Sequence, residues 1–128
     1  MKKEYLSLIE QAKKLVGERQ TSPNCVVAGV ASAILSGGGD VFTGVNIDCA
    51  CGIGFCAEHS AMAEMAKHGE TEIKAIVALH DDGKILSPCG RCRELMYQLN
   101  RANLQADIII SKDKTVKLEK LLPLPWER

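Results

Sequence analysis

The chain has 128 residues, of which 46% are hydrophobic and 25% are charged, with 16 basic and 16 acidic side chains. This length predicts one domain, residues 1–128, that needs no structural metal in order to fold. Balanced charge argues against a surface that follows nucleic-acid phosphates, and no stretch approaches the roughly 18 apolar residues of a membrane span. The first residues lack the apolar core of a signal peptide, so we expect a cytoplasmic protein that binds neither nucleic acid nor membranes.

The first part of the chain predicts a helix followed by a hairpin. Apolar residues at helical spacing among lysines and glutamates indicate an amphipathic helix over residues 2–16 that packs on a sheet. After a turn signal at 22–24, residues 25–35 are apolar enough for a strand buried on both faces. The glycines at 37–39 then turn the chain into a partner strand over 41–46. A phosphate-binding loop is the alternative for these glycines, but the lysine and helix that it requires do not follow.

The remaining part of the chain alternates between helical and strand patterns. Residues 57–68 are good helix formers, and residues 73–80 contain a continuous apolar run that is typical of a buried parallel strand. Further along, we expect a helix over 89–100, a strand over 106–111, a short strand over 115–118 and an extended tail over 121–126. The alternation predicts an α/β protein with a mixed sheet.

Six cysteines are many for a cytosolic protein, in which they indicate metal binding or catalysis before they indicate disulfides. Cys56 stands at the start of one predicted helix, and Cys89 and Cys92 stand at the start of another. Unpaired N–H groups at a helix N-terminus favour the thiolate, which is the form that binds metal. Three thiolates leave one position of a tetrahedral zinc ion open, as catalytic zinc sites do.

Glu58 follows Cys56 by two residues, which is close enough to reach a water in that open position without binding the metal. Zinc lowers the pKa of such a water toward about 7, so Glu58 could take its proton and return it to a substrate nitrogen. Two other interpretations remain open: a redox pair at positions 89 and 92, or a closed zinc site with four cysteines. The other cysteines, Cys25, Cys49 and Cys51, are expected to be small buried side chains or loop residues.

Taken together, the motifs Cys56-Ala57-Glu58 and Pro88-Cys89-Gly90-Arg91-Cys92 resemble those of the zinc-dependent cytidine deaminases of the small three-cysteine type. The resemblance covers nearly the whole chain. It is strongest to blasticidin S deaminase in four further segments, at residues 30–33, 42–46, 85–87 and 121–123. It implies a three-layer α/β/α fold with a mixed sheet of roughly five strands, in a homo-oligomer of four chains.

The resemblance also implies an activity and a set of site residues. Cys56, Cys89 and Cys92 would bind one zinc ion per chain, hydroxide would attack the ring carbon that bears the amino group, and Glu58 would shuttle the proton. Ammonia leaves, so the implied reaction is the hydrolytic deamination of cytidine or deoxycytidine in pyrimidine salvage. The implied substrate contacts are Asn46, Asp48, Ala57, Ser87, Pro88 and Trp126. Arg91 and Arg93 are the nearest groups that could offset the thiolate charge.

Three departures from the family pattern leave the substrate open. Ala28 replaces a phenylalanine that packs on the base, the loop between Asn46 and Cys56 is shorter than is typical, and His59, expected to be an ordinary helix residue, replaces an arginine. In addition, Asp48 stands where the family usually has a glutamate. The alternatives are a blasticidin S deaminase-like enzyme acting on a modified cytosine nucleoside or another aminated ring, and a zinc-containing binding protein without turnover. Aromatic residues make up only 4% of the chain, and the candidates to replace the missing ring are Phe42, Phe55 and Trp126.

Overall fold

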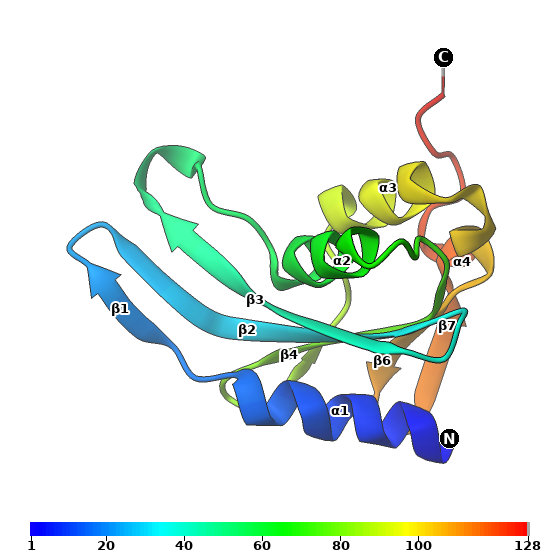
Figure 1. The fold of residues 1–128 in the computed structure, drawn as a ribbon, viewed down its shortest axis with the longest axis horizontal. Coiled ribbons are helices and arrows are strands. Elements are labelled where there is room, and N and C mark those ends of the chain that lie inside the picture. The colour runs from blue at the N-terminus through cyan, green and yellow to red at the C-terminus, as the bar shows by residue number, and fades with distance from the viewer. Residues whose placement is uncertain (128) are drawn as a thin grey trace.

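In the computed structural model, which describes residues 1–127, a mixed β-sheet carries helices on both of its faces (Figure 1). Within these residues the sheet has seven strands: β1 (Arg19–Ser22), β2 (Cys25–Ser36), β3 (Val41–Cys49), β4 (Ile73–His80), β5 (Ile85–Leu86), β6 (Asp107–Ser111) and β7 (Lys114–Lys117). The main path runs β1-β2-β4-β6-β7, while β3 pairs with β2 and β5 pairs with β4. β4 and β6 are parallel and the other pairs are antiparallel, so the predicted mixed sheet is confirmed.

Helices form a layer on each side of this sheet. α1 (Lys3–Leu15) covers one face, and α2 (Ala57–Lys67) and α3 (Gly90–Leu99) cover the other (Figure 1). The buried side chains of α1 recur at helical spacing, as the amphipathic pattern predicts. The arrangement confirms the α/β/α fold. No helix within residues 1–127 combines the length and the apolar composition that crossing a bilayer requires.

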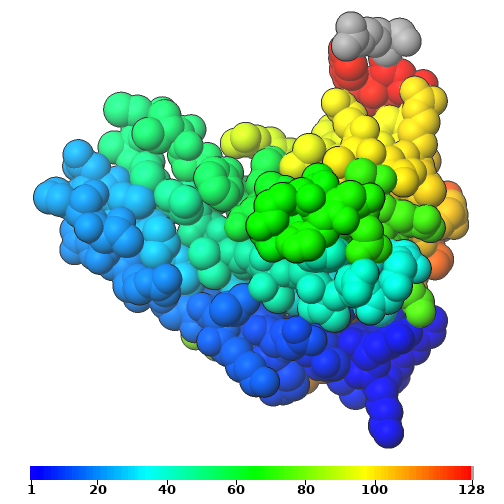
Figure 2. Space-filling view, in the orientation of Figure 1, coloured from blue at the N-terminus to red at the C-terminus, as the bar shows by residue number. Residues whose placement is uncertain are grey.

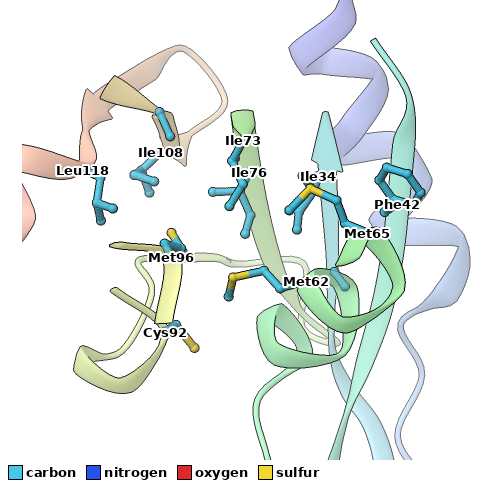
Figure 3. Packing of buried hydrophobic residues seen from close by; sticks show 12 residues of the cluster. Ile34, Phe42, Met62, Met65, Ile73, Ile76, Cys92, Met96, Ile108 and Leu118 are labelled. Carbon is cyan, nitrogen blue, oxygen red and sulfur yellow. The ribbon is translucent and has the colours of Figure 1, made fainter. Parts of the chain in front are cut away.

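Two apolar clusters hold the three layers together. On the face that carries α2 and α3, Met62, Met65 and Met96 gather around Ile34 and Ile76 of the sheet (Figure 3). A second cluster fills the space between the sheet and α1. Burying each of these large side chains contributes about 1.5–3 kcal/mol. The packing therefore fixes α2 and α3 against the sheet, and it fixes the residues at which these helices begin.

The elements that were not predicted from the sequence include two strands and the helical turn α4 (Leu118–Leu121). β1 is exposed at every position, so no apolar alternation marks it, and its pairing with β2 holds it in place. β5 has only two residues, too few for a recognisable pattern. The extended tail expected from residue 121 begins one residue later, because α4 (Leu118–Leu121) forms a short turn anchored by the fully buried Leu118.

Asn103 is a fully buried polar residue that connects β4 to α3 from the 3-10 turn η2 (Arg101–Gln105). Its Oδ1 accepts the N–H of Ile73 at 2.7 Å, and its Nδ2 donates to the carbonyls of Thr71 at 3.0 Å and Met96 at 2.8 Å. Leucine cannot form these bonds, so we expect Asn103→Leu to lower the free energy of unfolding by about 2–4 kcal/mol in urea denaturation. The exposed control Gln98→Ala should cost less than about 0.5 kcal/mol, and equal losses would contradict this role for Asn103.

Candidate active site

Three cysteine sulfurs converge where α2 and α3 begin. Cys56 is the residue before α2, Cys89 is the residue before α3, and Cys92 lies in the first turn of α3. The Sγ of Cys89 is 3.6 Å from that of Cys56 and 3.5 Å from that of Cys92. Around a tetrahedral zinc ion with Zn–S bonds of about 2.3 Å, sulfur atoms stand about 3.8 Å apart. The spacing of the three thiols therefore fits one shared metal ion.

The electrostatics of this thiol cluster also favour a cation. Burial raises the pKa of Cys56, and it raises the pKa of Cys92 far above its ordinary value, with the nearby Glu58 carboxylate adding to the effect. Burial also raises the pKa of Cys89, but the N–H groups of Cys92 and Arg91 and the adjacent thiols outweigh it and lower this pKa overall. Three adjacent thiolates repel one another, so a divalent cation among them would stabilise the charged forms.

Two glycines bring the backbone close enough to form this corner of the molecule. A Cβ on Gly54 would collide with the backbone carbonyl of Ile47, and a Cβ on Gly44 would collide with the first turns of α2. Ile47 and Phe55 also exchange backbone hydrogen bonds of 3.1 and 2.9 Å. The segment before α2 is thereby folded back on β3, which places Cys56 beside the end of that strand.

Glu58, the second residue of α2, lies beside the thiol cluster and is only 5% exposed. Burial raises the pKa of its carboxyl group, although the Glu58 N–H and the Cys92 thiol donate hydrogen bonds that lower the pKa in part. A carboxyl group in such a place takes up a proton more readily than one in water. Its position and its surroundings suit a group that accepts and returns protons.

A cavity of about 370 Å³ opens beside Glu58 and the thiols, a size that suits a small organic molecule. On the face shown in Figure 2, the surface is hollowed between the segment around residue 50 and the segment that precedes α3. The residues that line the cavity include Asn46, Asp48, Phe55, Glu58, Ser87 and Arg91. β3 thus contributes one wall, and the starts of α2 and α3 contribute the other.

Most of the substrate contacts expected from the sequence share this cavity. Asn46, Asp48, Ala57 and Ser87 line it, and the Oδ1 of Asn46 is fixed by the N–H of Val30 at 2.9 Å. Carboxylate, amide and hydroxyl groups therefore face the same space from two sides. Such a set of groups can orient a polar ring or a sugar through hydrogen bonds.

Other expected site residues lie outside the lining of this cavity. Pro88 borders a smaller space behind Glu58. Trp126 is 59% exposed, and its backbone N–H donates to the Glu94 carboxylate of α3 at 2.6 Å. Ala28, which occupies the position of the family's stacking phenylalanine, is fully buried at an irregularity in β2.

The two arginines differ in position. Arg91 lines the cavity, so its charge lies near the thiol cluster. Arg93 instead donates from Nε to the carbonyl of Pro88 at 2.8 Å and from Nη1 to the carbonyl of Leu121 at 3.0 Å. These bonds hold the Pro88–Cys89 segment against α4.

The structure adds His59 to the residues that contact the thiols. Its Nδ1 lies 3.5 Å from the Sγ of Cys92. Burial and the positive charge of Arg91 lower the pKa of His59, so near neutral pH the imidazole is uncharged and can still donate one N–H. His59 follows Cys56 by three residues, and residues with this spacing lie on the same side of a helix. The sequence could therefore have indicated that His59 lies near the thiols.

The closed four-cysteine site is not supported by the structure. Within residues 1–127, the potential ligand atoms that lie within 4.8 Å of one another in a group are those of Cys56, Cys89 and Cys92, without a fourth cysteine. Three thiols leave room in the coordination sphere for a water or a substrate group. An open site of this kind is typical of catalytic zinc.

The fold and this site define a zinc-dependent deaminase. Residues 2–106 match the family described as the cytidine and deoxycytidylate deaminase zinc-binding region. The chain belongs to this family, and its nucleoside-deaminase relatives imply a hydrolase that acts on a small molecule.

Individual relatives agree with this assignment. The cytidine deaminase of Halalkalibacterium halodurans is 33% identical over 102 residues, which cover 73% of this chain and 74% of the relative. The blasticidin-S deaminase of Bacillus cereus is 30% identical over 113 residues, 77% of each chain. The crystal structure of cytidine deaminase from Mycobacterium tuberculosis shares the fold, with a TM-score of 0.81 and 23% identity over 99% of this chain and all of that one (100%).

Proposed function

We propose that the protein catalyses the hydrolytic deamination of a cytosine-type nucleoside, cytidine or deoxycytidine, with the release of ammonia. The observation that carries the proposal is the buried Glu58 carboxyl group beside three converging thiols, at a cavity that is large enough for a small molecule. Relatives named cytidine deaminase support the choice of substrate.

Each residue of the site has a chemical role in this proposal. Cys56, Cys89 and Cys92 would hold one zinc ion, which when bound makes a water acidic enough to ionise near neutral pH. Glu58 would accept a proton from that water and pass it to the ring nitrogen, and would then accept the proton of the hydroxyl group added to the ring carbon and pass it to the departing amine. Because burial raises the pKa of Glu58, its carboxyl group can hold each proton between its uptake and its release.

Substrate binding would use the groups on both walls of the cavity. Asn46 and Asp48 on β3 would bind the sugar hydroxyls, and the backbone of Ala57 and Ser87 would face the base. Phe55, which lines the same cavity, would be the aromatic residue that contacts the ring. For Pro88 and Trp126, direct contact with substrate stays a prediction. Assembly into a tetramer also stays a prediction, and sedimentation analysis would test it.

A blasticidin S deaminase-like activity is the second candidate. The similarity to the Bacillus cereus enzyme over 77% of the chain favours it, together with the shorter acid at Asp48. The two candidate activities can be distinguished by measuring ammonia release from four compounds at equal concentration: cytidine, deoxycytidine, cytosine and blasticidin S. We expect kcat/KM to be at least about tenfold higher for one of the two nucleosides than for free cytosine, because Asn46 and Asp48 have no sugar to bind in the free base. Faster turnover of blasticidin S would favour the second candidate, and binding without turnover of any compound would indicate a binding protein.

We expect His59 to orient Cys92 through a hydrogen bond between its imidazole Nδ1 and the Cys92 sulfur. Replacing His59 with glutamine should lower zinc affinity by about 10–100-fold, the usual effect of removing a group that hydrogen-bonds to a metal ligand. Competition with a chromogenic chelator measures that affinity. His68→Gln, at the far end of the same helix, is the matched control and should leave zinc affinity unchanged. Equal zinc affinity in the two variants would show that His59 does not orient Cys92 for zinc binding.

A further inference from the structure

A second pair of cysteines faces each other at the end of the β2–β3 hairpin. Cys25 begins β2, Cys49 ends β3, and the two are direct partners in the antiparallel pairing. Their Sγ atoms lie 2.9 Å apart, with the Cys49 thiol donating to the Cys25 sulfur. This pair is separate from the thiols that would hold zinc.

The backbone geometry of this pair suits a disulfide. The adjacent pair is hydrogen-bonded, since the N–H of Ala50 donates to the carbonyl of Asn24 at 3.1 Å. Hydrogen-bonded and non-hydrogen-bonded pairs alternate along an antiparallel ladder, so Cys25 and Cys49 form a non-hydrogen-bonded pair. Cα atoms in such pairs are about 4.5 Å apart, within the range of about 4.4–6.8 Å found in disulfides. A bond can therefore form with little movement of the backbone.

An irregularity in β2 selects Cys49 as the partner. Between Val27 and Ala31 the register shifts, and Ala28 in this stretch has a φ of 62°. Beyond the shift, Ala31 pairs with Val45. If that register continued without a shift, Cys25 would face Cys51. The bulge instead brings Cys49 opposite Cys25 and leaves Cys51 exposed in the turn η1 (Ala50–Gly52).

Both thiols can be reached from solvent, and they differ in reactivity. Cys25 and Cys49 are each partly exposed, and Cys49 also lines the active-site cavity. The hydrogen bond from Cys49 lowers the pKa of Cys25, while the reciprocal contact raises the pKa of Cys49. The thiolate is the attacking form in thiol–disulfide exchange, so Cys25 is suited to attack first and Cys49 to complete the exchange.

We propose that Cys25 and Cys49 are a dithiol that small-molecule disulfides of the glutathione type oxidise reversibly to a cross-strand disulfide. The Cys25 thiolate attacks one sulfur of the oxidised molecule, which forms a mixed disulfide and releases one thiol. Cys49 then loses its proton and attacks the Cys25 sulfur, which releases the second thiol. Two protein thiols are oxidised and one small disulfide is reduced to two thiols. Excess reduced thiol reverses both steps.

The bond would restrain the wall of the cavity. It closes a loop of roughly 25 residues and joins the strand ends beside the segment that leads to Cys56. The oxidised protein should melt at a temperature higher by on the order of 10 °C. Amide hydrogen exchange should slow in residues 46–52, where strand ends otherwise open locally.

The test uses the full chain as isolated, treated with oxidised glutathione and then blocked with an alkylating agent. Digestion at Asp40 and Asp48 separates Cys25 from a peptide that contains Cys49, Cys51 and Cys56, so mass spectrometry detects the joined peptide pair and fragmentation of that pair assigns the link to Cys49. In a parallel oxidised sample that is not alkylated, reactive thiols counted in denaturant with a chelator should fall from six to four per chain. Cys25→Ser and Cys49→Ser should each abolish the link, whereas Cys51→Ser, the matched control, should retain it.

A link that involves Cys51, bonds between chains, or six unchanged thiols would each overturn the proposal. Circular dichroism of the serine variants checks that they fold, and the peptide map of the unaltered chain requires no variant. None of these measurements depends on deaminase activity, so the outcome is independent of the proposed function.

Discussion

Replacing Glu58 with glutamine is expected to remove deamination and to leave zinc in place. Glutamine fills nearly the same buried volume, but its amide cannot accept a proton from water or return one to the ring. General acid–base groups contribute about 10²–10⁴-fold, so kcat should fall by at least about 10²-fold. A coupled ammonia assay measures this loss, and elemental analysis measures the zinc content.

The matched control for this change is Glu64→Gln on the same helix. The side chain of Glu64 is 43% exposed and forms an ion pair with Lys67, away from the thiol cluster. Its replacement should change kcat by less than about twofold, in line with the small effects of exposed ion pairs. If Glu58→Gln retained the full rate with normal zinc content, Glu58 would not be the proton carrier.

Replacing Cys89 with alanine should remove both zinc and activity. Cys89 is exposed and lies outside the apolar clusters, so its loss affects the metal site more than the core. Two remaining thiols hold zinc weakly, so we expect well under one ion per chain after dialysis and a fall in kcat of at least about 10²-fold. Elemental analysis and the same ammonia assay measure the two effects.

Cys51→Ala is the control for this second change. Cys51 is also exposed but stands apart from the three converging thiols. It should keep one zinc ion per chain and the full rate. Removal of zinc by a chelator should reproduce the Cys89→Ala result in the unaltered chain, and activity should return when zinc is added back. Full activity in zinc-free protein would contradict the role assigned to the thiol cluster.

The parts of the site that follow from local sequence could be predicted. Cys56 and Cys89 both precede helix-forming segments, and a residue at the start of a helix has its surroundings determined by the next few residues. Glu58 was placed by its two-residue separation from Cys56. The limits of β4 (Ile73–His80) could also be predicted locally, because the strand contains a continuous apolar run that is bordered by polar residues.

The parts that depend on register between strands could not be predicted. Cys49 and Cys51 are separated from Cys25 by nearly the same number of residues. The bulge around Ala28 decides which of the two cysteines faces Cys25. Likewise β1 is a polar strand that exists through its pairing with β2. Arg93 and Trp126 have bonding partners that lie distant in the chain, at Leu121 and Glu94, and no local pattern encodes these contacts.

The most direct test of the account is ammonia release from cytidine and deoxycytidine by the zinc-loaded chain, measured beside Glu58→Gln at equal zinc content. We predict that the unaltered chain converts at least one of these nucleosides, with one ammonia released per deaminated product, and that the variant converts neither at a comparable rate. Equal rates in the two proteins, or no conversion of either nucleoside by the zinc-loaded unaltered chain, would contradict the central claim that this site deaminates cytosine-type nucleosides through Glu58.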